Sequence, residues 1–159
     1  MGIILKKGSA GIAAALRRKV GKIVVSAATE AFGEMGEELV NGIVSGDLSS
    51  WNDQSGALRS SIGCGVVCSG QIIKTFGFKS VLNDQTGAVE GKAYLAKLAQ
   101  QWARYTCALI IVAGKEYAVY VEAIDGKVVL SSARLRAKHI MVDRIKEKIR
   151  EKLEHENRR

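Results

Sequence analysis

Apolar residues recur at intervals of three and four between residues 9 and 45, and this spacing predicts a long helix, or two helices in line. Ser9 has a side chain suited to an N-cap. Glycines interrupt the stripe, and each weakens a helix by about 1 kcal/mol relative to alanine. A kinked helix on its own core and a close helix–helix contact both fit this pattern. The stripe consists of Ile12, Leu16, Val20, Ile23, Ala27, Ala31, Met35, Leu39 and Ile43.

The next segments alternate between turn formers and β-rich runs. Residues 46–56 are polar and predict a loop. Residues 62–68 and 71–78 flank the turn residues Ser69 and Gly70, which predicts a β-hairpin.

A helix is predicted within the sheet region. Apolar residues at helical spacing place it over residues 92–105, after a loop at 83–91. The β-branched run 106–113 then predicts a central strand buried on both faces.

The pattern after this strand predicts a second hairpin. Residues 117–124 alternate as a strand would, with Tyr117 and Tyr120 on opposite faces, and Asp125-Gly126 is a typical hairpin turn. Residues 127–130 are expected to pair back.

A last apolar stripe predicts a C-terminal helix over about residues 132–154, capped by Ser131 or Ser132. The whole pattern predicts an α+β fold in one domain of 159 residues. In this fold, a long N-terminal helix over about 9–45 and the C-terminal helix pack on a small, mainly antiparallel sheet. The sheet region spans about 57–130 and contains the inserted helix.

Composition is that of an ordinary globular protein, with 47% hydrophobic and 25% charged residues. The most apolar uncharged run, residues 105–114, is about half as long as a membrane span, so no membrane contact is expected. The N-terminal residues do not match a signal peptide. We therefore expect Cys64, Cys68 and Cys107 to be reduced, largely buried thiols of a protein made in the cytoplasm.

The net charge of +8 is unevenly distributed. Residues 1–25 carry bases and no acid, residues 30–47 carry acids and no base, and the last third is basic again. This asymmetry indicates contact with a polyanion or with copies of the chain placed head to tail. Solvated helix faces explain it equally well. The candidate assembly residues are Arg17, Arg18, Lys19, Glu34, Glu37, Glu38, Arg59, Arg144, Lys148 and Lys152.

The chain offers little catalytic or metal-binding chemistry. His139 and His155 have no carboxylate or cysteine at ligand spacing. Glu116 and Glu122 are six residues apart and share a face only on an extended strand. No catalytic residue and no cofactor is therefore expected, and an enzyme is disfavoured.

The segment 63–68, which contains glycines and cysteines, also lacks a recognised metal-binding or nucleotide-binding motif. Cys64 and Cys68 share a strand face, but their C-x-x-x-C spacing is not that of a zinc knuckle. Gly63 and Gly65 fall short of a dinucleotide-binding motif and are more typical of a strand that another backbone approaches closely.

Nucleic-acid binding has some support. Bases cluster at both ends of the chain, and Trp51, Trp102 and Tyr105 are able to stack on bases. Trp102 lies on an apolar helix face and is explained more simply as a core residue. Since no sequence-specific signature is present, the expectation is limited to non-specific contact with DNA.

Two segments resemble a family of tailed-phage neck proteins, the head–tail joining or tail-completion proteins of long-tailed phages. Residues 53–62, Asp-Gln-Ser-Gly-Ala-Leu-Arg-Ser-Ser-Ile, resemble its D-x-[TS]-G-x-L-R-x-S-I segment. Residues 112–123 resemble its second signature, a strand that ends in Y-A-x-Y-V-E. Val119 stands where many members have proline. The segment 71–105 is longer than in compact members, as in an enlarged variant.

The resemblance implies a structural virion protein that forms an oligomeric ring and joins or seals the head and the tail. Its expected partners are other copies of itself, the portal or an adaptor, and tail-terminator or tail-tube proteins, with genome DNA passing through the ring. The basic residues of the C-terminal helix are then expected to dock on acidic surfaces of the adjoining layer. The alternative is a DNA-binding accessory protein that uses its basic N- and C-terminal helices.

Overall fold

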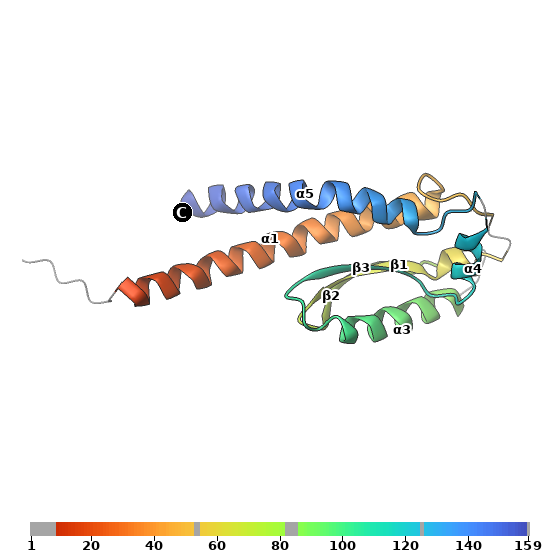
Figure 1. Cartoon of the computed structure of the whole chain (residues 1–159), viewed down its shortest axis with the longest axis horizontal. Helices are drawn as coiled ribbons and strands as arrows, with labels where there is room; N and C mark the ends of the chain where they lie inside the picture. The colour runs from red at the N-terminus through yellow and green to blue at the C-terminus, as the bar shows by residue number, and fades with distance from the viewer. Residues whose placement is uncertain (1–8, 53–54, 82–85, 125, 159) are drawn as a thin grey trace, which may run out of the picture.

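The computed structural model describes residues 9–52, 55–81, 86–124 and 126–158, and it has an α+β fold, as predicted. Its elements in chain order are α1 (Ser9–Ser45), α2 (Ala57–Ser60), β1 (Ile62–Cys68), β2 (Gln71–Gly77), α3 (Thr86–Gln101), β3 (Ala108–Ala113), α4 (Ala118–Ala123) and α5 (Ser131–Asn157). The strands form one antiparallel sheet in the order β2-β1-β3. Helix α1 packs on one face of the sheet, α3 covers the other, and α5 runs along α1 (Figure 1).

The alternation of side chains along β1 explains why both faces of the sheet are covered. Cys64 points toward α1, where a side chain at Gly36 would meet its sulfur at 2.7 Å. Gly65 points toward α3, where a Cβ atom would lie 2.8 Å from a methyl carbon of Leu95. A Cβ atom at Gly63 would likewise meet the ring of Phe78, so the two glycines of β1 make room for side chains on this face and not for the backbone that the sequence predicts.

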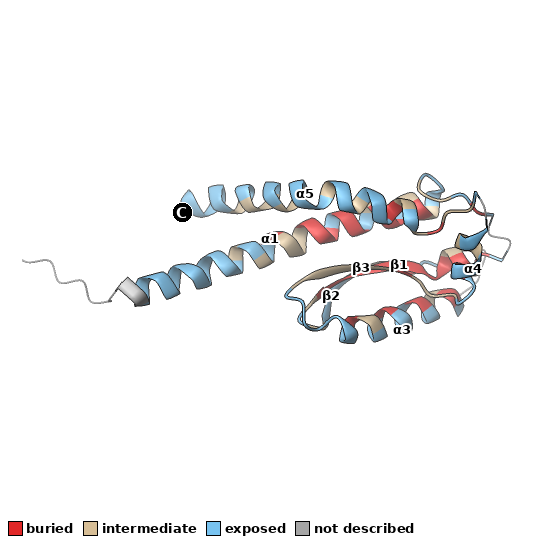
Figure 2. Ribbon diagram, in the orientation of Figure 1, coloured by how far each residue is buried: buried red, intermediate tan, exposed pale blue. Residues whose placement is uncertain are grey.

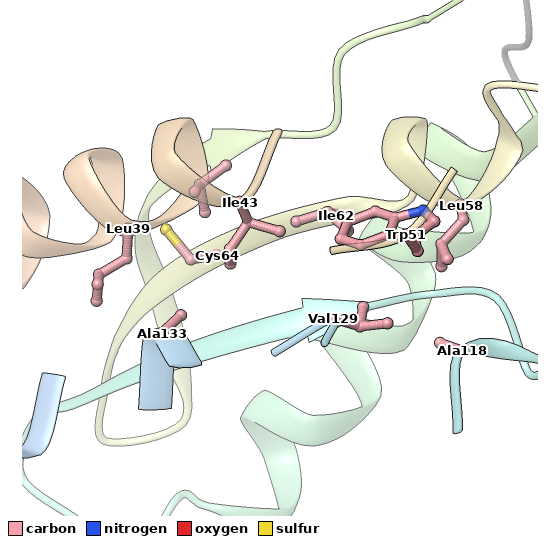
Figure 3. Packing of buried hydrophobic residues seen from close by; sticks show 10 residues of the cluster. Leu39, Ile43, Trp51, Leu58, Ile62, Cys64, Ala118, Val129 and Ala133 are labelled. Atoms are coloured by element: carbon pink, nitrogen blue, oxygen red, sulfur yellow. The ribbon is translucent and has the colours of Figure 1, made fainter. Parts of the chain in front are cut away.

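The core lies between the C-terminal half of α1 and the sheet (Figure 2). Leu39 and Ile43 are fully buried there against Ile62 of β1. Figure 3 shows the cluster of Leu39, Ile43, Trp51, Leu58, Ile62, Cys64, Ala118, Val129 and Ala133. This cluster joins α1, α2, β1, α4 and the start of α5 into one packed body.

Two predictions for the second half of the sheet are wrong. Strand β3 is an edge strand and mostly half-buried, because β1 takes the central position. Residues 118–123 form the helix α4 and not a strand, so Tyr117 and Tyr120 do not alternate across a sheet. No strand is present at residues 127–130 within the described part of the chain, and Asp125 of the predicted turn lies outside it.

The helix boundaries also differ in places. Helix α3 begins at Thr86 and ends at Gln101, so part of the predicted loop is helical. Helix α5 continues to Asn157, three residues beyond the expected end near 154. Neither Ser131 nor Ser132 caps it: Leu130 occupies the N-cap position and has no side-chain cap. The predicted hairpin over 62–78 and the helix over 9–45 are confirmed.

Candidate assembly surface

The N-terminal part of α1 extends beyond the body as an arm, which we define as residues 11–26. Every arm residue is exposed or half-buried, and Ala27 is the first buried residue of α1 among those whose burial is described (Figure 2). The first turns of the arm also reach past the end of α5 (Figure 1). The arm is thus a helix that is largely surrounded by solvent.

One side of this arm is apolar. Ile12, Leu16 and Val20 are 49%, 61% and 48% exposed, and their spacing of four places them on one helix face. Val24 continues the row with 39% exposure. The apolar spacing predicts either a core position or a helix–helix contact for Ile12, Leu16 and Val20. The core interpretation is wrong for these three residues, because the sheet is too short to cover the first half of α1. We call Ile12, Leu16, Val20 and Val24 the arm stripe.

Ion pairs join α1 to α5. Lys152 Nζ lies 2.6 Å from Glu30 Oε1, and Lys148 Nζ lies 2.8 Å from Glu34 Oε1. Glu38 binds two guanidinium groups, those of Arg144 at 2.9 Å and Arg136 at 2.6 Å. The acids recur every four residues on α1 and face bases at the same spacing on α5. We call this row the ion-pair ladder.

The ladder uses half of the predicted assembly residues inside one subunit. Glu34, Glu38, Arg144, Lys148 and Lys152 all belong to it. Hydrogen bonds to Glu34 and Glu151 raise the pKa of Lys148, which fits a cation held by two carboxylates. The opposite charges of residues 30–38 and the C-terminal helix therefore serve first to hold α5 along α1.

The other candidate assembly residues lie outside the ion-pair ladder. Arg17 and Arg18 are exposed on the arm, and Lys19 pairs with Glu156 near the end of α5 at 2.8 Å. Glu37 is exposed on α1 beside the ladder.

Arg59, another candidate assembly residue, binds within the subunit. Its Nη1 donates to the Val44 carbonyl oxygen at 2.9 Å, and its guanidinium lies 5.5 Å from the centre of the Trp51 ring. The cation thus neutralises the C-terminal end of α1, where helix carbonyl groups need donors.

An apolar groove lies between β3 and α5 and has a volume of about 930 Å³. Strand β3 forms one wall with its outer edge, which pairs with no strand in the described part of the chain. The main apolar lining residues are Phe32, Met35, Leu109, Ile111, Met141 and Ile145.

A small aromatic cluster lies at the end of α3. The rings of Trp102 and Tyr105 are 5.2 Å apart, and the guanidinium of Arg104 lies 5.9 Å and 5.0 Å from their centres. Trp102 and Tyr105 are each 42% exposed, so the interpretation of Trp102 as a core residue is wrong.

The carboxylate of Glu122 binds the N-terminal end of α5. It accepts hydrogen bonds from the backbone N–H groups of Leu130 and Ser131 at the start of α5. Burial alone would raise the pKa of Glu122, but these hydrogen bonds and that of the Ser131 hydroxyl outweigh it and lower the pKa. Glu122 thereby replaces the missing side-chain cap of α5.

The described residues contain no group of three or more His, Cys, Asp or Glu side chains that could hold a metal ion. Among the helices in the same part of the chain, none is long and apolar enough to cross a membrane. Comparison with known proteins gave no match, either to a family model, to a curated protein or to a solved structure.

Proposed function

We propose that the chain is a structural subunit, without catalytic activity, that assembles with copies of itself into a ring at the head–tail junction of a tailed phage. The arm stripe is the observation that carries this proposal. Single exposed apolar residues are ordinary, but a continuous apolar row on a helix that extends from the body is typical of an interaction surface. In an isolated subunit the arm stripe stays in water.

The charge of the arm supports contact between unlike surfaces. Arg17, Arg18, Lys19 and Lys22 make the arm basic, and it contains no acid. Two such arms repel each other, so each arm binds a different surface of the next copy. Contacts between unlike surfaces close into rings when the rotation between subunits permits. We assign the apolar groove between β3 and α5 as the surface that receives the arm.

The resemblance to phage neck proteins supports the head–tail junction as the proposed place of assembly. In the first matching segment, Leu58 and Ile62 are buried, and Gly56 has a positive φ of 77° at the turn into α2. Asp53 and Gln54 of this segment lie outside the described residues. The second segment forms α4 and not the strand of the family signature, so it adds no structural support. The proposed partners are the portal or an adaptor and the tail-terminator or tail-tube proteins, in the virion.

Light scattering after size exclusion and native mass spectrometry test the assembly. The wild-type chain should form one closed oligomer whose size does not depend on salt. Leu16→Glu should shift it toward monomers, because a charge in the arm stripe opposes burial. Val89→Glu is the matched control, since Val89 is 68% exposed on α3, a helix on the opposite face of the sheet from α1 (Figure 1). A monomeric wild-type chain, or equal oligomers for both variants, would contradict the proposal.

The second candidate function is non-specific binding of single-stranded DNA, which the exposed cluster of Trp102, Arg104 and Tyr105 favours. Exposed aromatic rings beside a cation are typical of surfaces on which bases stack. Fluorescence anisotropy with a labelled oligonucleotide tests it. A DNA-binding protein should lose affinity steeply between low and moderate salt, and Trp102→Ala should weaken binding at every salt concentration. Salt-independent oligomers without DNA binding would exclude this function.

A further inference from the structure

Two thiols from different strands lie in direct contact at one end of the sheet. Cys68 Sγ and Cys107 Sγ are 3.1 Å apart. Cys68 ends β1, and Cys107 precedes β3, one step beyond the last paired residues Val67 and Ala108. Residues that face each other across antiparallel strands have the Cα separation that a disulfide requires. Little movement is therefore needed to join these two sulfur atoms.

The third cysteine has a different environment. Cys64 is completely buried, and burial raises its pKa to about 12. Cys68 and Cys107 are half-buried, so the prediction of three largely buried thiols is correct for Cys64 alone. A dissolved oxidant thus reaches the pair more easily than it reaches Cys64.

We propose that Cys68 and Cys107 form a reversible redox site that closes to an intramolecular disulfide under mild oxidation. The proposal rests on the positions of the two thiols and does not require the assembly proposed above, although Cys107 also lines the groove assigned to the arm. The oxidant is a small hydroperoxide such as hydrogen peroxide.

The order of the steps follows from the raised pKa of Cys107. Burial, together with the hydrogen bond to Cys68, raises the pKa of Cys107 to about 11, so we assign the first attack to Cys68. The Cys68 thiolate attacks one peroxide oxygen, the O–O bond breaks, and the other oxygen leaves as water after taking up a proton. This gives a sulfenic acid at Cys68.

The second step closes the bond. The sulfur of Cys107 attacks the Cys68 sulfur, the S–O bond breaks, and the hydroxyl group leaves with the Cys107 proton as a second water. In total, two thiols lose two electrons and two protons, and one peroxide becomes two water molecules. A dithiol reductant returns the disulfide to two thiols by thiol–disulfide exchange and is itself oxidised to a disulfide.

The site is placed where the arm joins the body. Thr29 of α1 lies 3.6 Å through its hydroxyl oxygen from each of the two sulfurs, and Ala27 is the first buried residue of the helix. A disulfide would fix the ends of β1 and β3 to each other directly beneath this junction. Oxidation therefore restricts the movement of β1 and β3 relative to each other where α1 leaves the sheet and continues as the arm.

Disulfide mapping of the full chain tests the proposal. Reduced protein is treated with one equivalent of hydrogen peroxide, alkylated in denaturant and digested. We expect a cross-linked peptide pair containing Cys68 and Cys107, with Cys64 alkylated. The same treatment in urea should form this bond at least about tenfold more slowly, because only the folded chain holds the sulfurs in contact.

Variants provide the controls. Cys64→Ser should oxidise at the wild-type rate, whereas Cys68→Ser and Cys107→Ser should form no intramolecular disulfide. The comparison of folded and urea-treated wild-type chain needs no variant and remains decisive if a substitution disturbs folding. Equal rates with and without urea, a cross-link that includes Cys64, or disulfides only between chains would overturn the proposal.

Discussion

The carboxylate of Glu122 on α4 accepts a hydrogen bond from the backbone N–H of Ser131, the first residue of α5, at 2.9 Å. Its second oxygen accepts from the N–H of Leu130 at 2.8 Å. An acid from another helix therefore supplies both the hydrogen-bond acceptor and the negative charge that a helix N-terminus favours. This contact positions α5 before the ion-pair ladder begins.

Removal of this cap should destabilise the chain. We expect Glu122→Ala to lower the free energy of unfolding by about 1 kcal/mol, the usual effect of losing an N-cap. Urea denaturation followed by circular dichroism measures it. Glu116→Ala serves as the control, because Glu116 is an exposed acid of the same region. Equal stability of the two variants would show that the cap contributes nothing.

The same contact should depend on pH. The pKa of Glu122 in the folded chain lies below its ordinary value of 4.5, so folding favours the ionised form. Its stabilisation is complete above the unfolded pKa and is lost as the pH falls through the folded pKa. The stability difference between wild type and Glu122→Ala should therefore be constant near neutrality and shrink below about pH 4.5. A difference that grows with acid would contradict this assignment.

The ion-pair ladder should behave as an internal contact of the subunit. We expect Glu30→Lys to cost up to about 1 kcal/mol, because an exposed ion pair contributes about that much at most. Adding Lys152→Glu should restore part of the loss, since the swap recreates the pair with reversed charges. Glu147→Lys controls for the change in net charge. A double-mutant cycle at low and high salt measures the coupling, and zero coupling at low salt would argue against the pair.

Two helical glycines should respond in opposite directions to alanine. A Cβ atom at Gly91 of α3 would overlap the Ser61 carbonyl oxygen and lie 2.7 Å from the ring of Phe78. Gly91→Ala should therefore destabilise the chain by about 1–3 kcal/mol, as overpacking does. Gly21→Ala meets nothing within 4 Å and should stabilise by up to about 1 kcal/mol through helix propensity. Thermal unfolding measures the melting temperature of both variants. Melting temperatures that change in the same direction would contradict this packing.

Sequence patterns predict the elements that are long or locally marked. The stripe of α1 has a period that only a helix satisfies, and Ser69-Gly70 specifies the first hairpin. The segment 117–124 is too short for its pattern to distinguish strand from helix. It became α4, which leaves Val119 and Tyr120 on the surface.

The candidate site was harder to predict, because it depends on which elements meet. The repeated spacing of Glu30, Glu34 and Glu38 on one helix and of Arg144, Lys148 and Lys152 on another was a signal for the ladder. Periodicity alone does not say whether a helix extends beyond the sheet it covers, so it could not show which part of the α1 stripe is buried and which part is exposed. The contact of Cys68 with Cys107 depends on the register of β1 against β3, which composition does not determine.

The arm and the main core element are one uninterrupted helix, and this has a mechanical consequence. The arm's residues 11–26 span about 24 Å at the rise of an α-helix, and no break separates them from Leu39 and Ile43 in the core. The helix therefore acts as a lever: a force on the arm tip is transmitted to the sheet, with the pivot near Ala27. In an assembly held by such arms, strain in one subunit would be passed to the interior of the next through rigid rods and not through flexible linkers.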